Sequence, residues 1–165
     1  FTTISENIQI SAGLRLKGRK LEIEYKLTDP AGVVCKGIEP GVSSAWARAD
    51  GLWQSTCFEA FLGEFGEPGY WELNFSPGQR QWNCYRFEAY RLPQPPTASR
   101  DFELSQVECT ADTMKCTVIA GKEMPSLECS LTAVILTSAG IRYFALTHAL
   151  AKPDFHHRDS FSLRV

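Results

Sequence analysis

Apolar and polar residues alternate along most of this chain, and the three-to-four-residue spacing of an amphipathic helix is almost absent. Residues 8–16 show the pattern first, and residues 21–27 repeat it after a turn signal at 17–19. The same alternation between turn signals predicts strands over residues 8–16, 21–27, 56–62, 70–76, 81–91, 101–110, 113–120, 127–137, 140–147 and 161–165. About nine or ten short strands at this spacing are typical of an all-β fold. We expect an antiparallel β-sandwich that resembles a jelly roll.

Length and composition indicate one globular domain. The chain has 165 residues, of which 44% are hydrophobic and 22% charged, so it can bury a single core. The Pro-rich segment 93–96 is too short to separate two domains, and we expect one domain over residues 1–165. The net charge of −2 and the lack of a basic patch argue against nucleic acid and anionic membrane as partners. No apolar stretch of about 18 residues is present, so no membrane-spanning helix is expected.

The six cysteines lack the spacing of a metal or redox motif. The closest two are seven residues apart, and neither a CxxC motif nor a Cys-His cluster occurs. We therefore expect reduced, structural thiols and a cytoplasmic protein, although a removed signal peptide would reverse that expectation. Cys109 and Cys116 flank a predicted hairpin turn, where they could lie nearly opposite each other. They are the pair most able to form a disulfide.

Two segments carry most of the chemistry, residues 50–62 and residues 70–82. Glu59 lies in an otherwise apolar strand, where a carboxylate is costly unless it is paired or faces a wet groove. Alternation places Glu72 and Asn74 on one face of the next strand, and we expect Trp82 and Arg86 to extend that face. Planar hydrogen-bonding groups beside an aromatic ring suit a sugar, which has hydroxyls and an apolar C–H face.

Three short motifs resemble one known group of domains. They are Leu52-Trp53 followed by Cys57-Phe58-Glu59-Ala60-Phe61-Leu62, then Tyr70 through Pro77-Gly78 to Trp82, and finally Asp159-Ser160-Phe161 before alternating apolar residues. In this order they resemble the family 9 carbohydrate-binding modules and the related DOMON-like ligand-binding domains. The resemblance implies a non-catalytic domain that holds a sugar between two aromatic rings, with Trp53 as one ring and Glu59 as a hydroxyl acceptor.

The chain departs from that family in two places. The acidic positions after the tryptophan are Ser55 and Thr56 here, which puts any contact that they make in the family in doubt. The late loop, 148–159, contains no tryptophan for the second ring and offers Phe155, His156 and His157 instead. The ligand therefore need not be the sugar of the family.

We expect a small-molecule ligand, most simply a sugar, with no cofactor, no metal ligand and no catalytic residue. The expected ligand-binding residues are Arg48, Trp53, Glu59, Asn74, Arg86, Phe155, His156 and His157. Glu59 should be joined by Asn74 and at least one arginine. The late loop should fold over the end of the sandwich that holds Trp53, so that His156 or His157 approaches Trp53 or Glu59. The oligomeric state is left open.

Other interpretations of these residues remain open. Trp53 could be a core plug, and Glu59 could be an ion-pair partner of Arg48 or Arg86. His148, His156 and Asp159 are a candidate metal site. A b-type haem domain would need Met114 or Met124 with a histidine as axial ligands, and an enzyme would use Glu59 with a loop histidine as acid and base. No nucleophile elbow, HExxH motif or phosphate loop supports catalysis.

Overall fold

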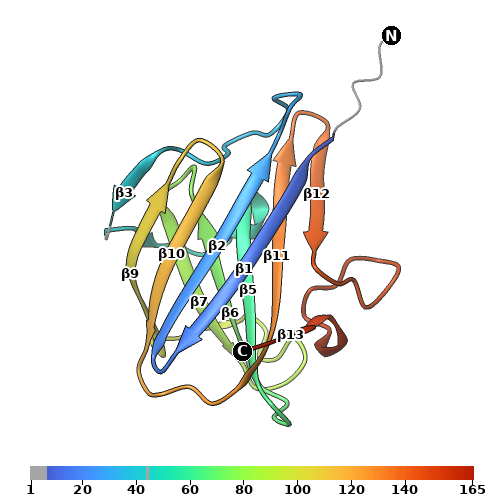
Figure 1. Ribbon diagram of the computed structural model, residues 1–165. Coiled ribbons are helices and arrows are strands. Elements are labelled where there is room, and N and C mark those ends of the chain that lie inside the picture. The colour runs from blue at the N-terminus through green and yellow to red at the C-terminus, as the bar shows by residue number, and fades with distance from the viewer. Residues whose placement is uncertain (1–6, 44) are drawn as a thin grey trace.

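The protein is a sandwich of two β-sheets (Figure 1). A computed structural model describes residues 7–43 and 45–165, so residues 1–6 and 44 of the expected domain lie outside the described part. The first sheet has the spatial order β1 (Gln9–Lys17), β2 (Lys20–Thr28), β10 (Thr113–Ala120), β9 (Phe102–Cys109) and β3 (Gly41–Ser43). The second has the order β12 (Gly140–Ala145), β11 (Leu127–Thr137), β5 (Cys57–Glu64), β6 (Tyr70–Ser76), β7 (Gln81–Phe87) and β4 (Ala47–Arg48). β13 (Leu163–Arg164) pairs with β11, and β8 (Thr97–Ala98) pairs with β7.

The expected antiparallel β-sandwich is confirmed, with one parallel contact between β4 and β7. Strands β6, β10 and β11 have the bounds that alternation predicts. β7 ends at Phe87 and not at residue 91, because the chain turns there: the amide of Glu88 donates to the carbonyl of Leu92, and Arg91 has a positive φ. The sequence did not reveal β3, β4 and β8, which have two or three residues each and are too short to show alternation.

The second sheet packs against an apolar layer on each of its two faces. Its inner face packs against the first sheet, and the hydroxyl of Tyr25 on β2 crosses the core to donate to the carbonyl of Glu59 at 2.5 Å. Its outer face is also covered, since every residue of β6 is buried. The outer layer is formed by Leu52, Cys57, Phe61, Tyr70, Tyr85, Phe87, Val134, Phe155 and Phe161. The segment after β12 supplies Phe155 and Phe161, and Figure 1 shows it beside this sheet before the chain returns through β13.

The cysteines are free thiols at all six positions. Cys109 lies opposite Met114, whereas Cys116 lies opposite Val107. The expectation that Cys109 and Cys116 lie nearly opposite each other is therefore wrong, because a two-residue turn pairs residue 110 with residue 113 and places the two cysteines diagonally. Among the described residues no helix is long and apolar enough to cross a lipid bilayer.

Candidate ligand-binding site

A cavity of about 440 Å³ opens on the outer face of the second sheet. Strands β5, β6, β7, β11 and β12 supply its floor, and the segments after β7 and after β12 supply its walls. Its lining residues are Trp53, Glu59, Phe61, Glu72, Phe87, Arg91, Gln94, Pro96, Val134, Tyr143, Lys152, Pro153, Phe155 and His156. Aromatic lining residues beside a small number of polar groups are typical of small-molecule sites.

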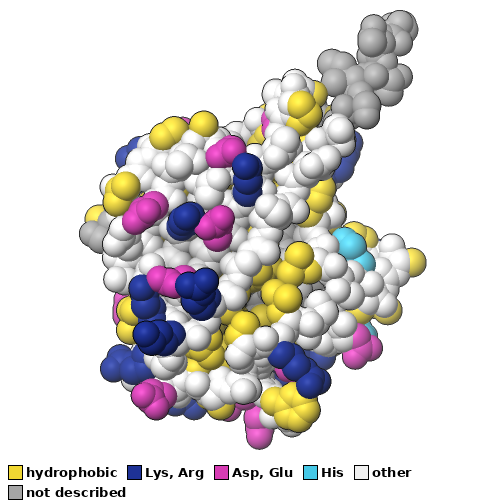
Figure 2. All heavy atoms as spheres, viewed as in Figure 1, with side chains coloured by type: hydrophobic (Ala, Val, Ile, Leu, Met, Phe, Trp, Pro, Cys, Tyr) yellow, Lys and Arg dark blue, Asp and Glu magenta, His cyan; other side chains and the backbone are white. Residues whose placement is uncertain are grey.

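A larger hollow, of about 730 Å³, lies on the outer face of the first sheet and has a different character. Its lining is mostly polar or charged, and Lys115 forms an ion pair with Glu24 across it at 3.1 Å. Figure 2 shows basic and acidic side chains interspersed over this face. It lacks an aromatic lining residue, so we consider the smaller cavity the better ligand site.

Two buried carboxylates lie at the floor of the 440 Å³ cavity. Glu59 on β5 is paired across the strands with Asn74 on β6, and Glu72 lies two residues before Asn74. Because side chains of a strand alternate between faces, all three share the outer face of the sheet. Glu59 is 2% exposed and Glu72 is 6% exposed.

Neutral donors hold these carboxylates in place. The hydroxyl of Thr132 donates to Glu59 Oε2 at 3.1 Å, and the amide of Asn74 donates to Glu72 Oε1 at 2.9 Å. Among the described residues, no arginine forms an ion pair with Glu59. Asn74 joins Glu59 on the same face as expected, and the arginine that shares the cavity with Glu59 is Arg91, without an ion pair between them.

Burial raises the pKa of both carboxyl groups. The pKa of Glu72 rises to about 7 because burial disfavours the charged form, while the Asn74 hydrogen bond and the Arg91 charge act in the opposite direction. Burial raises the pKa of Glu59 well above its ordinary value, and the nearby charge of Glu72 raises it further. Near neutral pH the pair retains at least one proton, because burial disfavours the charged form of each group and two ionised carboxylates would also repel each other.

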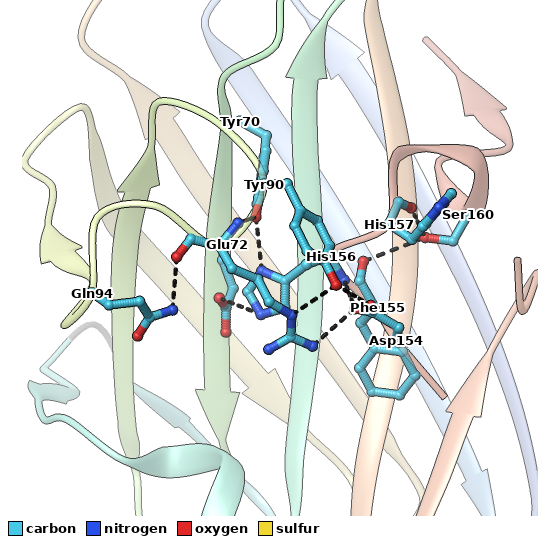
Figure 3. Close-up of polar contacts among 10 residues, drawn as sticks. Tyr70, Glu72, Tyr90, Gln94, Asp154, Phe155, His156, His157 and Ser160 are labelled. Carbon is cyan, nitrogen blue, oxygen red and sulfur yellow. Dashed lines mark hydrogen bonds and ion pairs between the residues drawn. The ribbon is translucent and has the colours of Figure 1, made fainter. Parts of the chain in front are cut away.

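His156 contacts Glu72 from the late loop (Figure 3). Its Nδ1 lies 2.9 Å from the hydroxyl of Tyr70, and its Nε2 lies 3.8 Å from Glu72 Oε2. The imidazole packs edge-on against Phe61 and Phe87, with ring centroids 5.1 and 5.0 Å away. Burial and then the charge of Arg91 lower the pKa of His156 to about 4, so the ring is neutral near pH 7.

A polar cluster joins the two loops that form the cavity walls. Arg91 Nη2 lies 2.9 Å from Asp154 Oδ1, and the hydroxyl of Tyr90 donates to Asp154 Oδ2. The amide of His156 donates to the same carboxylate at 3.2 Å. Asp154 therefore neutralises Arg91 and positions His156 over the cavity.

The structure brings Trp53, Glu59, Phe155 and His156 together at the cavity, as the sequence analysis expected. Trp53 follows the left-handed Gly51, lies on a short 3-10 helix, η1 (Leu52–Gln54), and is 38% exposed, so it is not a core plug. His156 shares the cavity with Trp53 and Glu59, but its contacts are with Tyr70 and Glu72. Whether any of these residues touches a ligand stays a prediction.

His157 lies outside the cavity lining. It is the N-cap residue of a second 3-10 helix, η2 (Arg158–Ser160), where its Nδ1 accepts from the amide of Asp159 at 3.4 Å. Its role is therefore local to the loop.

Arg48, Trp82 and Arg86 do not share the face of Glu59. In the observed register Trp82 pairs with Phe75 and Arg86 pairs with Trp71, so the three lie on or beside the inner face. The sequence analysis placed Trp82 and Arg86 on the same face as Glu59. That expectation is wrong, because Asn83, Tyr85 and Phe87 are the residues of β7 that occupy the outer face.

Stacking explains why both arginines prefer the inner side. The Arg48 guanidinium lies 4.1 Å from the Trp82 ring centre, and that of Arg86 lies 4.2 Å from the Trp71 ring centre. Arg48 also donates to the carbonyls of Ser99 and Phe102, at 2.7 and 2.8 Å. The suggested ion pairs of Glu59 with these arginines are therefore ruled out.

The sequence analysis missed several residues of the cavity. Glu72 was placed on the correct face but was not included in the binding set, although the Glu59 argument applies to it equally. Arg91, Gln94 and Lys152 carry no pattern that marks them, because the folded loops alone bring them to the cavity.

The described residues do not bring together the side chains that the metal and haem alternatives require. Over residues 7–43 and 45–165, no group of three or more His, Cys, Asp or Glu side chains is arranged to hold a metal ion. Met114 and Met124 pack in the core between the sheets, whereas His156 lies on the outer face of the second sheet. His148 lies against Phe155, with ring centroids 6.1 Å apart.

Comparison with known proteins supports the fold. No protein-family model and no curated protein matches this sequence. A solved structure described as a "putative carbohydrate-binding protein from Bacteroides uniformis ATCC 8492" is similar, with a TM-score of 0.60 and 12% sequence identity. The similarity covers 94% of this chain and 77% of that one. At this identity the likeness shows a shared β-sandwich architecture.

Proposed function

We propose that this domain binds a small saccharide in the 440 Å³ cavity, without catalysing a reaction. The observation that carries the proposal is the pair of buried carboxylates, Glu59 and Glu72, at the floor of a pocket with aromatic walls. Hydroxyl groups of a sugar donate to such acceptors, and the apolar face of the sugar ring packs on aromatic side chains. The structural similarity to the protein described as a "putative carbohydrate-binding protein" agrees with this function.

Each part of the cavity has a role in this proposal. Trp53 provides the exposed aromatic ring at the mouth, and Phe61 and Phe87 line the interior. Glu59 and Glu72 accept hydroxyl hydrogen bonds, whereas Arg91, Gln94 and Lys152 offer donors from the walls. This assignment extends the resemblance to the DOMON-like and family 9 modules, with His156 in place of their second aromatic ring.

Tryptophan fluorescence offers a direct test. Of the four tryptophans, Trp53 alone lines the cavity and is 38% exposed, while Trp46, Trp71 and Trp82 are each at most 8% exposed. Titration with a panel of mono- and disaccharides should change the emission of the wild type. The change should be lost in Trp53→Phe, although calorimetry should still detect the binding.

Glu59→Gln should weaken binding of the same saccharide at least about tenfold, because an NH2 group, which cannot accept a hydrogen bond, replaces one of the two carboxyl oxygens. The exposed Glu123→Gln variant is the matched control, because it removes a carboxylate that does not line the cavity. If no saccharide in the panel binds, or if Glu59→Gln binds as tightly as the wild type, the proposed function is wrong.

A second candidate function is supported by the 3.8 Å separation of His156 Nε2 and Glu72 Oε2. A carboxyl group with a pKa of about 7 beside a neutral imidazole can transfer a proton to or from a bound sugar. NMR spectra of the bound saccharides, followed over time, separate the two functions. An enzyme would convert its ligand and lose that activity in Glu72→Gln, whereas a binding domain would leave every saccharide unchanged.

A further inference from the structure

We propose that the ligand carries a primary ammonium group, as an amino sugar does, and that this group lies between Glu59 and Glu72. The inference rests on the saccharide-binding function proposed above and names the class of its ligand. It follows from two features of the cavity floor, its charge and its hydrogen-bonding groups.

The floor has two acidic groups and no cation of its own. The guanidinium of Arg91 is already paired with Asp154, and Lys152 is exposed in the wall of the cavity. Among the described residues, neither Arg91 nor Lys152 forms an ion pair with Glu59 or Glu72. A ligand cation can therefore supply the charge that the floor lacks.

Hydrogen-bond acceptors also outnumber donors among the polar groups on this face. Among the described residues, the side-chain donors that reach the two carboxylates are the hydroxyl of Thr132 and the amide of Asn74. Each carboxylate can accept about four hydrogen bonds, so most of this capacity is unused.

Asn74 adds a third acceptor to the same face. Its side chain is 0% exposed, and its Oδ1 has no hydrogen-bond partner in the described part of the protein. Asn74 lies directly across from Glu59 and its amide donates to Glu72, but Asn74 is not among the residues that line the cavity. Its unsatisfied oxygen shows that donors are scarce beside the two carboxylates, which do line the cavity and can accept hydrogen bonds from a ligand.

An ammonium group matches this arrangement better than a hydroxyl does. It brings three donors and no acceptor, whereas a hydroxyl brings one donor and leaves the two carboxylates without a counter-charge. With a neutral ligand, both carboxyl groups are largely protonated near pH 6.5, because burial raises the pKa of each and their charges would also repel each other. With an ammonium ligand both groups ionise, so the protons that they retain are released to solvent on binding.

The titratable and charged groups around the pair come from every element that packs against it. They are Tyr25 on β2, Cys57 on β5, Tyr70 on β6, Tyr85 on β7, Arg91 after β7, Tyr143 on β12, and Lys152, Asp154 and His156 in the late loop. Since the pKa of His156 is about 4 and Arg91 is paired with Asp154, the carboxyl pair is the proton donor near pH 6.5.

Isothermal titration calorimetry tests the inference on the whole chain at about pH 6.5, where a primary ammonium is charged. The ligands are glucosamine, galactosamine and mannosamine, their parent hexoses, their N-acetyl forms and cyclohexylamine, which has an ammonium but no hydroxyl. Measurements in phosphate and in MOPS give the number of protons released.

We expect the best amino sugar to bind at least about tenfold more tightly than its parent hexose and its N-acetyl form. Between one and two protons should be released per ligand in the wild type, because both carboxyl groups have raised pKa values and are largely protonated at this pH. Glu59→Gln and Glu72→Gln should lose both the preference and the proton release, whereas Glu123→Gln should keep them. The wild-type proton count is a test that does not depend on any variant folding.

The outcomes separate this inference from the proposed function. Hexoses that bind as tightly as amino sugars, with no proton released, would overturn the ammonium inference and leave saccharide binding intact. Tight binding of cyclohexylamine without any saccharide binding would support the ammonium site but overturn the saccharide function. If no member of the panel binds, both are overturned.

Discussion

Replacing Glu72 with Gln should change how the free energy of unfolding depends on pH. The pKa of Glu72 is raised from its ordinary value of 4.5 to about 7 in the folded protein. Between these values the folded state binds a proton that the unfolded state does not, so stability falls as pH rises. The pKa difference corresponds to about 3 kcal/mol. Relative to Glu72→Gln, the wild type should lose about this much stability between about pH 4.5 and 7.

His156 has the opposite effect on the free energy of unfolding, over a range of pH that largely overlaps that of Glu72. Its pKa is lowered from 6.5 to about 4, so the unfolded state binds the extra proton and stability rises as pH increases. Relative to His156→Gln, the wild type should gain about 3 kcal/mol as pH rises from about 4 to 6.5. The two residues thus oppose each other, and the raised pKa of Glu59 adds to the effect of Glu72.

Urea unfolding at fixed ionic strength, repeated at several pH values between about 4 and 8, gives the free energies. Differences between each variant and the wild type isolate each residue, and Glu123→Gln should differ from the wild type by a constant amount. If the difference for Glu72→Gln does not change with pH, this carboxyl group titrates normally. The account of a buried, proton-retaining pair would then be wrong.

Three further predictions concern other parts of the fold. Gly63→Ala should destabilise the protein by about 1–3 kcal/mol in urea unfolding, since its Cβ would lie 1.4 Å from Arg158 Nη1 and displace that guanidinium; unchanged stability would contradict this. Tyr25→Phe should cost about 1–2 kcal/mol, because the carbonyl of Glu59 loses its buried donor; a loss below about 0.3 kcal/mol would show that the bond contributes little. Trp53→Ala should weaken saccharide binding and change the melting temperature little, because this side chain is partly exposed; an unfolded variant would identify it as structural.

Strand positions could be predicted because they depend on local alternation. The segments 70–76, 113–120 and 127–137 have the predicted bounds, since each places apolar residues on the face that packs against the other sheet. The likeness to a jelly roll stays a prediction. Short edge strands could not be found, because two or three residues cannot display a period.

Which face of β7 points inward could not be predicted in the same way. Trp82, Cys84 and Arg86 alternate with Asn83, Tyr85 and Phe87, so each face carries both polar and apolar groups. The choice is made by neighbours distant in sequence: Trp82 stacks on Phe75, with ring centroids 6.5 Å apart. Alternation identifies two faces but says which one is inner only when their polarity differs.

The sequence by itself determined that the chain forms a β-sandwich and that Glu59 needs a special environment, because both follow from hydrophobic period and the cost of burying charge. Only the tertiary structure decided which groups surround Glu59. Glu72 reaches it through strand pairing, while His156 and Arg91 arrive from loops more than 50 residues apart that Asp154 joins. Loop conformations depend on such long-range contacts and leave no periodic pattern in the sequence. The sequence therefore could not show that Arg91, and not Arg48 or Arg86, lines the cavity.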